Sequence, residues 1–403
     1  MRVLQINSVC GVGSTGRIAT DIHKVLVEHG HESLLAYGRE THPSCSHAIR
    51  IGDSLSIYGH VLETRLFDRH GLGSAKATQH FCRQIERLAP DVVHLHNIHG
   101  YYLNYEILFS YLKTAGKRVV WTLHDCWAFT GHCAYFDYVK CGKWRGGCYL
   151  CPQKSTYPAS LWLDNSSMNY RRKVAAFSGV PDLTFVTPSN WLASLVKQSF
   201  LQPYNVRVIN NGIDLDVFAP TPSTFRRTHG LGNKFVILGV ASQWSQRKGL
   251  SYLLALARTL ATDEVIVLVG LSEKQNKELP IGIISIPKTH SVKALAEIYS
   301  VADVFVNPTL EDNFPTTNIE ALACGTPVIT FASGGSGESV GGDCGHVVPT
   351  GDLVGLRIAI NGTKSAGKLH YSGACRERAL LLYDKWTRFA DYLIVYTGRG
   401  DGT

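Results

Sequence analysis

The chain has 403 residues, of which 45% are hydrophobic and 18% charged, and its formal net charge is +8 at pH 7. This length predicts about two domains, and the composition is typical of a soluble globular protein, which excludes a disordered or fibrous one. The positive excess lies mainly in residues 1–220, which carry 22 Lys and Arg against 16 Asp and Glu. A basic first half suits anionic partners. No basic stripe interleaved with aromatic residues occurs, so we expect no nucleic-acid binding.

No apolar run approaches the roughly 20 residues that span a bilayer. The first residues, "MRVLQINSV", lack the longer apolar core of a signal peptide and predict a buried strand. We therefore expect a cytoplasmic protein. Its 11 cysteines then predict no disulfide framework, because the cytoplasm keeps thiols reduced.

Short β-branched runs alternate with amphipathic, helix-like segments along the whole chain, which predicts βαβ units and parallel sheets. The predicted strands cover residues 3–7, 33–38, 91–97, 118–125, 183–189, 235–242, 265–270, 283–287, 303–308 and 327–330. The predicted helices cover residues 16–30, 77–89, 249–261, 293–302 and 319–325. The segment 218–232, rich in Pro, Gly, Ser and Thr, is the predicted linker, so we expect one domain at 1–220 and another at 221–403, with a cleft between them.

Ligands of open α/β sheets bind beyond the carboxyl ends of strands, so the loops that follow strands are the candidate sites. The first such loop contains Gly11, Gly13 and Gly16, which leave the backbone bare before a helix N-terminus that can hold an anion. The end of the predicted strand 91–97 and the loop after it carry His94, His96 and His99. A metal site is one interpretation; structural or substrate-lining histidines are favoured because no carboxylate triad accompanies them.

Two later loops carry polar pairs. His124 and Asp125 end a strand and can hydrogen-bond a sugar hydroxyl, although Asp125 can also simply cap the next turn. Arg247 and Lys248 precede Gly249 and a helix, and two cations beside a helix N-terminus suit a diphosphate.

The stretch "EDNFPTTNIEALACGTPVI" (311–329) gathers acids just before a predicted helix. Acids at a helix N-terminus can be plain caps, each contributing roughly 0.3–1 kcal/mol. However, Asp312 and Glu320 bracket a Pro-Thr-Thr loop, and the second acid lies inside the helix. We favour carboxylates that accept hydrogen bonds from a polyhydroxylated ligand.

Together these segments resemble the retaining glycosyltransferases of family four, over nearly the whole chain. The resemblance rests on "VINNGIDLDVF" (208–218), "RKG" (247–249), "YSVADVFVNPTLEDNFPTTNIEALACGTPVI" (299–329) and "GHVVPTGD" (345–352), in family order. "WTLHD" followed by a cysteine run resembles the bacterial exopolysaccharide and colanic-acid-type branch. The resemblance implies a GT-B fold of the α/β class, with two Rossmann-like domains whose parallel sheets face each other across a cleft. It also leaves room for the last helix to pack back on the N-terminal domain.

The family pattern also implies roles for particular residues. It has two Glu separated by seven residues. Glu320 matches the second, and the first position holds Asp312, preceded by Glu311. The family's diphosphate-binding Arg and Lys lie six positions apart; Lys248 matches the Lys, Ser242 stands at the Arg position, and Arg247 is a substitute. The implied catalytic set is His124, Asp125, Arg247 and Lys248. The implied donor-binding set is Gly13, Ser242, Glu311, Asp312, Thr316, Thr317 and Glu320, and His96 and His99 lie on the implied acceptor side.

The implied reaction transfers a sugar from a nucleotide diphosphate sugar to a lipid-linked or polysaccharide acceptor in surface polysaccharide biosynthesis, with no cofactor required for catalysis. The basic first domain and the resemblance also predict peripheral, salt-sensitive contact with the inner membrane. The alternatives are a nucleotide-sugar epimerase or a non-catalytic binding protein of the same fold, since a fold alone does not fix a function.

A cysteine-rich loop at 126–151 remains. Cys133, Cys141, Cys148 and Cys151 could hold a structural zinc ion in a tetrahedral thiolate site. A redox role for Cys148 and Cys151 and plain buried thiols are the alternatives.

Overall fold

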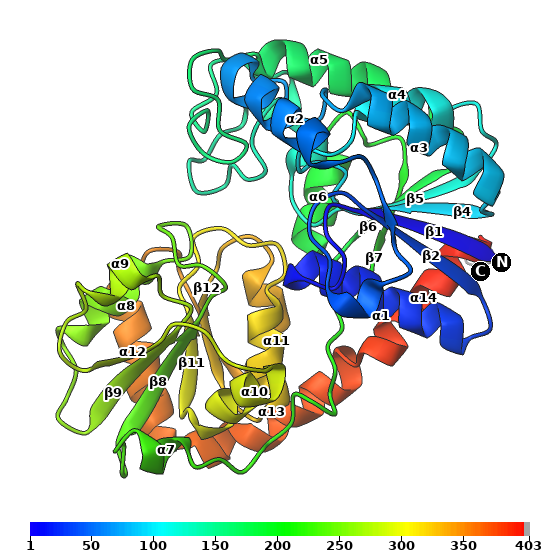
Figure 1. The fold of residues 1–403 in the computed structure, drawn as a ribbon. Helices are drawn as coiled ribbons and strands as arrows, with labels where there is room; N and C mark the ends of the chain where they lie inside the picture. Colours follow the sequence, from blue (N-terminus) through cyan, green and yellow to red (C-terminus); the bar gives the residue numbers. More distant parts are fainter. Residues whose placement is uncertain (399–403) are drawn as a thin grey trace. The chain divides into compact units, whose positions relative to one another are not determined.

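The computed structural model describes residues 1–398, which form two compact units (Figure 1). The first unit comprises Met1–Ile209 together with the chain from Phe389 onward, and the second comprises Asn210–Arg388. The boundary therefore falls 11 residues before the predicted one at 220. The predicted linker at 218–232 is wrong because Phe218 and Leu231 are buried in the core of the second unit.

The first unit is built on a seven-stranded sheet with the order β3-β2-β1-β4-β5-β6-β7, and all its neighbouring strands pair in parallel. Its strands are β1 (Arg2–Asn7), β2 (Glu32–Tyr37), β3 (Ile49–Arg50), β4 (Val92–Leu95), β5 (Arg118–Thr122), β6 (Leu183–Thr187) and β7 (Asn205–Val208). Its helices are α1 (Gly13–Glu28), α2 (Ser54–Phe67), α3 (Ala75–Leu88), α4 (Tyr105–Leu112), α5 (Ser166–Phe177) and α6 (Asn190–Lys197), with 3-10 turns η1 (Pro43–Cys45), η2 (Trp127–Phe129) and η3 (Lys143–Arg145).

The second unit repeats this plan with a six-stranded parallel sheet of order β10-β9-β8-β11-β12-β13. Its strands are β8 (Phe235–Val240), β9 (Glu264–Val269), β10 (Ile283–Ile286), β11 (Val304–Asn307), β12 (Val328–Phe331) and β13 (Gly345–Val348). Its helices are α7 (Phe225–Thr228), α8 (Leu250–Ala257), α9 (Glu273–Asn276), α10 (Val292–Val301), α11 (Thr316–Ala323), α12 (Leu353–Ala366) and α13 (Lys368–Leu382), with the 3-10 turn η4 (Ser336–Ser339). The α/β class with two Rossmann-like domains is confirmed.

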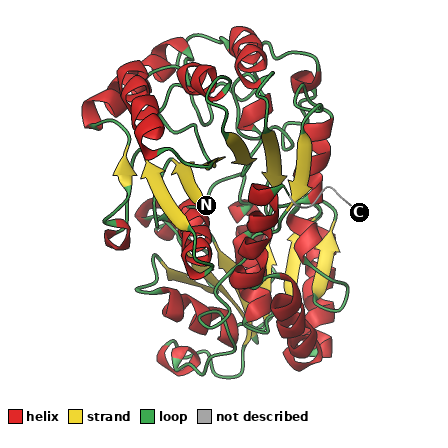
Figure 2. Ribbon diagram, turned by 90° about the vertical axis from the view of Figure 1, so that its right-hand side faces the viewer, coloured by secondary structure: helices red, strands yellow, loops and turns green. Residues whose placement is uncertain are grey.

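Helices cover both faces of each sheet (Figure 2), and the alternation of side chains along the strands explains why. In β1, Leu4 and Ile6 point into one core and Val3 into another. In β8, Val236 and Leu238 point into one core and Ile237 into the other. Strands buried on both faces read as continuous apolar runs, which made them visible in the sequence.

The last helix, α14 (Lys385–Thr397), begins in the second unit and ends in the first. Phe389, Tyr392 and Tyr396 are buried with residues of α1 and β1 in the first unit. Hydrogen bonds hold this half of the helix to the sheet, because Tyr392 Oη lies 2.9 Å from Thr122 Oγ1 and Tyr396 Oη lies 2.7 Å from His94 Nδ1. Across residues 1–398, no helix has the length and apolar character needed to cross a bilayer.

Candidate active site

The strand order of each sheet reverses direction at one point, and this point selects the loops that can form a site. The reversal lies between β1 and β4 in the first unit and between β8 and β11 in the second. Neighbouring loops diverge at such a point and leave a crevice at the carboxyl edge of the sheet. Most of the residues predicted from the sequence follow one of these four strands.

In the second unit, the Arg247–Lys248 loop lies directly on the loop after β11. Gly249 makes this approach possible: its φ is +76°, and a Cβ there would lie 1.9 Å from the Pro308 carbonyl oxygen. The Leu310 N–H donates to the Arg247 carbonyl at 2.8 Å. Only glycine fits this turn, so the "RKG" segment fixes the two cations at the end of β11.

These two cations contact the two acids that follow β11. Lys248 Nζ lies 2.5 Å from Asp312 Oδ2, and Arg247 Nη1 donates to the Glu311 carbonyl oxygen at 2.6 Å. Burial alone would raise the pKa of the Asp312 carboxyl, but the Lys248 and Arg247 cations outweigh burial and lower it. Asp312 is therefore ionised at neutral pH. The structure thus brings four predicted residues of the second unit into one cluster.

The start of α11 decides between capping and a ligand-binding role for the acids. The N-cap residue of α11 is Pro315, no side chain caps the helix, and its first turn contains no acid. Asp312 is thus not a helix cap. Thr316 and Thr317 form the first turn and are half-buried, and the uncapped N–H groups there favour an anion.

Glu320 and Ser242 lie elsewhere around this cluster. Glu320 is buried inside α11, and its Oε2 accepts the Tyr299 hydroxyl at 3.1 Å. Ser242 is exposed just after β8. The carboxylates of Asp312 and Glu320 thus have different partners in this structure, Lys248 for the first and Tyr299 for the second.

In the first unit, the predicted histidines fall into two groups. His96 links to His124, with 3.2 Å between His96 Nδ1 and His124 Nε2, and also to Gln5, with 3.1 Å between His96 Nε2 and Gln5 Oε1. Burial lowers the pKa of His124 to about 4 and holds that of His96 well below its ordinary value. Both imidazoles are neutral at pH 7, so they offer hydrogen bonds without charge. His94 instead bonds to Thr122 and Tyr396 and anchors α14.

The second group joins His99, Asp125 and Tyr157. His99 Nε2 lies 3.0 Å from Asp125 Oδ2, and His99 Nδ1 lies 3.0 Å from the Tyr157 hydroxyl. The other Asp125 oxygen accepts the Trp127 N–H at 2.9 Å, so Asp125 also caps η2. Burial would raise the pKa of Asp125, but His99 lowers it below its usual value. One carboxylate thus both orders the loop and faces a histidine.

Gly13 begins α1 after the glycine loop that follows β1. Its φ is +63°, and a Cβ there would meet no atom within 4 Å. The α1 N-cap, Val12, makes no side-chain cap hydrogen bond. A bare glycine at an uncapped helix N-terminus suits the close approach of an anionic group.

The four cysteines predicted to gather line one small cavity. Cys148 Sγ accepts the Gly131 N–H at 3.1 Å. Across residues 1–398, however, no three His, Cys, Asp or Glu side chains are arranged to hold a metal ion. The zinc site therefore does not fit the side-chain geometry as it stands, and it remains a prediction for metal analysis.

The sequence did not single out several residues that complete these clusters. Tyr157 lies far along the chain from His99, and Tyr299 lies in another helix from Glu320. Lys173 is buried under the cysteine loop, where it donates to the carbonyls of Trp127 and Thr130 at 2.5 and 2.9 Å. Burial lowers the Lys173 pKa to about 7.

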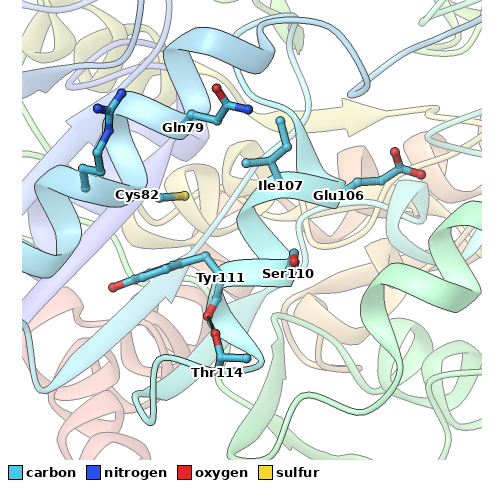
Figure 3. Close-up of a pocket in the computed structure, with 8 residues that line it drawn as sticks. Gln79, Cys82, Glu106, Ile107, Ser110, Tyr111 and Thr114 are labelled. Carbon is cyan, nitrogen blue, oxygen red and sulfur yellow. Dashed lines mark hydrogen bonds between the residues drawn. The ribbon is translucent and has the colours of Figure 1, made fainter.

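A separate hollow of the first unit lies between α3 and α4 (Figure 3). It is lined by Gln79, Cys82, Arg83, Glu106, Ile107, Ser110, Tyr111 and Thr114. None of the residues predicted from the sequence lines it, so we assign the candidate site to the strand ends instead.

Comparisons with known proteins agree with this geometry. Residues 15–217 match the family described as Glycosyltransferase Family 4, and residues 234–362 match the one described as Glycosyl transferases group 1. The putative colanic acid biosynthesis glycosyl transferase WcaC of Escherichia coli (strain K12) is 26% identical over 374 residues, covering 88% of this chain and 89% of WcaC.

Two solved structures share the fold across nearly the whole chain. Sucrose-phosphate synthase from Thermosynechococcus elongatus superposes with a TM-score of 0.74 at 18% identity, covering 99% of this chain and 98% of that one. HepE from Anabaena, solved with UDP and glucose, superposes with a TM-score of 0.70 at 15% identity, covering 98% and 99%. These identities support the fold alone.

Proposed function

Because this chain belongs to glycosyltransferase family 4, we propose that it is a retaining transferase that moves a sugar from a nucleotide diphosphate sugar to a lipid-linked or polysaccharide acceptor in surface polysaccharide biosynthesis. The observation that carries the proposal is the cluster of Arg247, Lys248 and Asp312 beside the uncapped α11. The nucleotide found in HepE and the name of WcaC support the donor class and the pathway.

The donor diphosphate would be held by positive charge. Lys248 and Arg247 are two adjacent cations, and the first turn of α11 adds N–H groups and the positive end of the helix dipole. Negative charge grows on the diphosphate as the bond to the sugar breaks. Fixed cations and N–H groups that meet this charge stabilise the transition state more than the ground state.

The sugar and acceptor would be bound by uncharged groups. A neutral His124 can donate to or accept from a sugar hydroxyl. In the transfer step, the acceptor oxygen bonds to the anomeric carbon on the face that the diphosphate leaves. The acceptor proton passes to a diphosphate oxygen, so atoms and charge balance without a cofactor.

A panel of nucleotide sugars and lipid-linked acceptors tests the proposal directly. Transfer with retained anomeric configuration supports it. Epimerisation of the donor without an acceptor would support an epimerase, and binding without turnover would support a non-catalytic module. Glu320→Ala should weaken donor binding because it removes the second acid of the family pattern.

We also propose that the protein acts in the cytoplasm and associates peripherally with the inner membrane. The excess of six positive charges in residues 1–220 supports this contact, and screening makes it sensitive to salt. Sedimentation with anionic vesicles at low and high salt is the test. A chain that stays in the supernatant at low salt contradicts the association.

A further inference from the structure

Side chains connect the surface of the first unit to the His99–Asp125 pair in a continuous series. The Arg39 Cζ lies 5.8 Å from the centre of the Tyr101 ring. The rings of Tyr101 and Tyr157 lie 6.1 Å apart, and Tyr157 bonds His99 as described above. A ligand bound at Arg39 would therefore lie next to aromatic rings that end at a predicted catalytic carboxylate.

The backbone at Tyr101 is strained, which points to a functional role. Its φ is +71°, a left-handed conformation that is unfavourable for a residue other than glycine. Neighbouring contacts hold it there: the Gly100 N–H donates to His70 Nε2 at 3.3 Å, and the Tyr102 hydroxyl donates to the Asn97 carbonyl at 2.9 Å. Strain that the surroundings maintain is typical of binding sites.

Two arginines act on this aromatic pair. Arg39 follows β2 and Arg65 lies on α2, and both are exposed. Burial raises the pKa of Tyr101, and both guanidinium groups oppose that rise. Within residues 1–398, neither Arg39 nor Arg65 has an ion-pair partner. Arg39, which lies 5.8 Å from the Tyr101 ring, and Arg65 are thus two unpaired cations of this unit that can bind an anion.

Apolar side chains lie on both sides of Arg65. Leu55, Tyr58 and Leu62 share its helical face, at spacings of three and four residues, and Leu55 and Tyr58 are 81% and 72% exposed. The Leu161 N–H donates to the Arg65 carbonyl at 2.8 Å, which places the loop of Leu161, Trp162 and Leu163 against the end of α2. Trp162 is 71% exposed. A helix that is apolar on its outward face is suited to a hydrophobic partner.

We propose that Arg39 and Arg65 bind the phosphate or diphosphate of a lipid-linked acceptor, that Tyr157, which is 45% exposed beside the buried Tyr101, stacks on its first sugar, and that its hydrocarbon chain lies on the apolar face of α2. This inference rests on the proposed function and names the acceptor-binding residues within it. An amphiphilic phosphate ester is the one ligand class that uses the cations, the aromatic rings and the exposed apolar face together.

The test measures binding of farnesyl diphosphate to the full chain by titration calorimetry. Arg39→Gln combined with Arg65→Gln should weaken binding about tenfold, because the diphosphate loses two charged hydrogen-bond donors at a partly exposed site. The matched control combines Arg83→Gln and Arg171→Gln, two other exposed arginines of the same unit, and should leave the affinity unchanged. Wild-type affinity in the Arg39 and Arg65 variant overturns the proposal.

Further measurements distinguish a lipid-linked diphosphate from free diphosphate and from a membrane headgroup as the bound anion. Leu62→Ser should weaken binding of farnesyl diphosphate but not of inorganic diphosphate, whereas Ile281→Ser, at a 99% exposed residue of the second unit, should change neither. Equal affinity for inorganic diphosphate and farnesyl diphosphate would refute the claim that the hydrocarbon chain binds on α2. If binding to phosphatidylglycerol vesicles depends on Arg39 and Arg65 to the same extent, the two arginines bind a membrane headgroup and not the acceptor, which overturns the proposal. Arginine-dependent binding in a chain that transfers no sugar contradicts the proposed function and leaves this site intact.

Discussion

Lys248→Ala should lower both turnover and stability, for two separable reasons. In the proposed mechanism Lys248 faces a diphosphate on which charge grows, and loss of one such group typically lowers kcat by about 100- to 1,000-fold. The same change leaves Asp312 without its partner. Breaking a buried pair costs about 3–5 kcal/mol, and since the Lys248 side chain is 26% exposed, we expect about 1–3 kcal/mol here.

The double variant Lys248→Ala, Asp312→Asn separates the two effects. It removes the unpaired carboxylate, so urea denaturation should show most of the stability restored. Turnover should stay low, because the cation is still absent. Steady-state kinetics on the three proteins measures this, with Lys293→Ala, an exposed lysine of α10, as the control for loss of a positive charge.

Two results would refute this reasoning. Wild-type turnover in Lys248→Ala would mean that the cation does not act on the leaving group. Recovery of turnover in the double variant would mean that Lys248 only neutralises Asp312.

Three further predictions concern the supporting structure. His60 Nε2 accepts the Gly71 N–H at 3.0 Å, and burial lowers the His60 pKa to about 4, so at this residue the unfolded chain binds more protons than the folded chain between pH 6.5 and 4. His60 should therefore contribute about 2 kcal/mol to the fall in the free energy of unfolding from pH 7 to 5, beside the other buried histidines, and His60→Gln should remove that contribution. Gly249→Ala should lower the free energy of unfolding by more than about 2 kcal/mol and raise the KM for the donor, because the new Cβ would meet Pro308. As a control, Gly362→Ala in α12, whose Cβ would meet no atom within 4 Å, should raise the free energy of unfolding by about 0.5–1 kcal/mol. The zinc hypothesis predicts about one zinc ion per chain in reduced protein, and Cys148→Ser should abolish zinc binding. A folded wild-type chain that mass spectrometry shows to be free of metal would contradict the hypothesis.

The clustering of Arg247, Lys248, Glu311 and Asp312 in the second unit could be predicted from the sequence because its signals are local. Arg247, Lys248 and Gly249 are consecutive, and Glu311 and Asp312 follow an apolar strand directly. Position after a strand, charge and one glycine are enough to place such a cluster. The parallel sheets were equally visible, because strands buried on both faces are continuous apolar runs.

What the sequence could not provide depends on contacts between distant segments. Tyr157 reaches His99 across 58 positions, and Tyr299 reaches Glu320 only because α10 packs on α11. The domain boundary was misplaced for a related reason. Pro, Gly, Ser and Thr in 218–232 correctly indicate irregular backbone, but irregular backbone can be packed, and Phe218 and Leu231 are buried.

The two candidate clusters differ in charge, and the difference fits the chemistry proposed for each. In the second unit, Arg247 and Lys248 stand beside Asp312, whose pKa is lowered, so the cluster stays ionised at neutral pH. In the first unit, burial lowers the pKa of His124 and His96, so their imidazoles stay neutral. A diphosphate leaving group requires charge, whereas sugar hydroxyls need donors and acceptors that do not compete for that charge. A transferase built this way should keep its activity constant from about pH 6 to 8, because neither imidazole titrates there. A bell-shaped dependence of kcat on pH, centred in that range, would show that another group acts in catalysis.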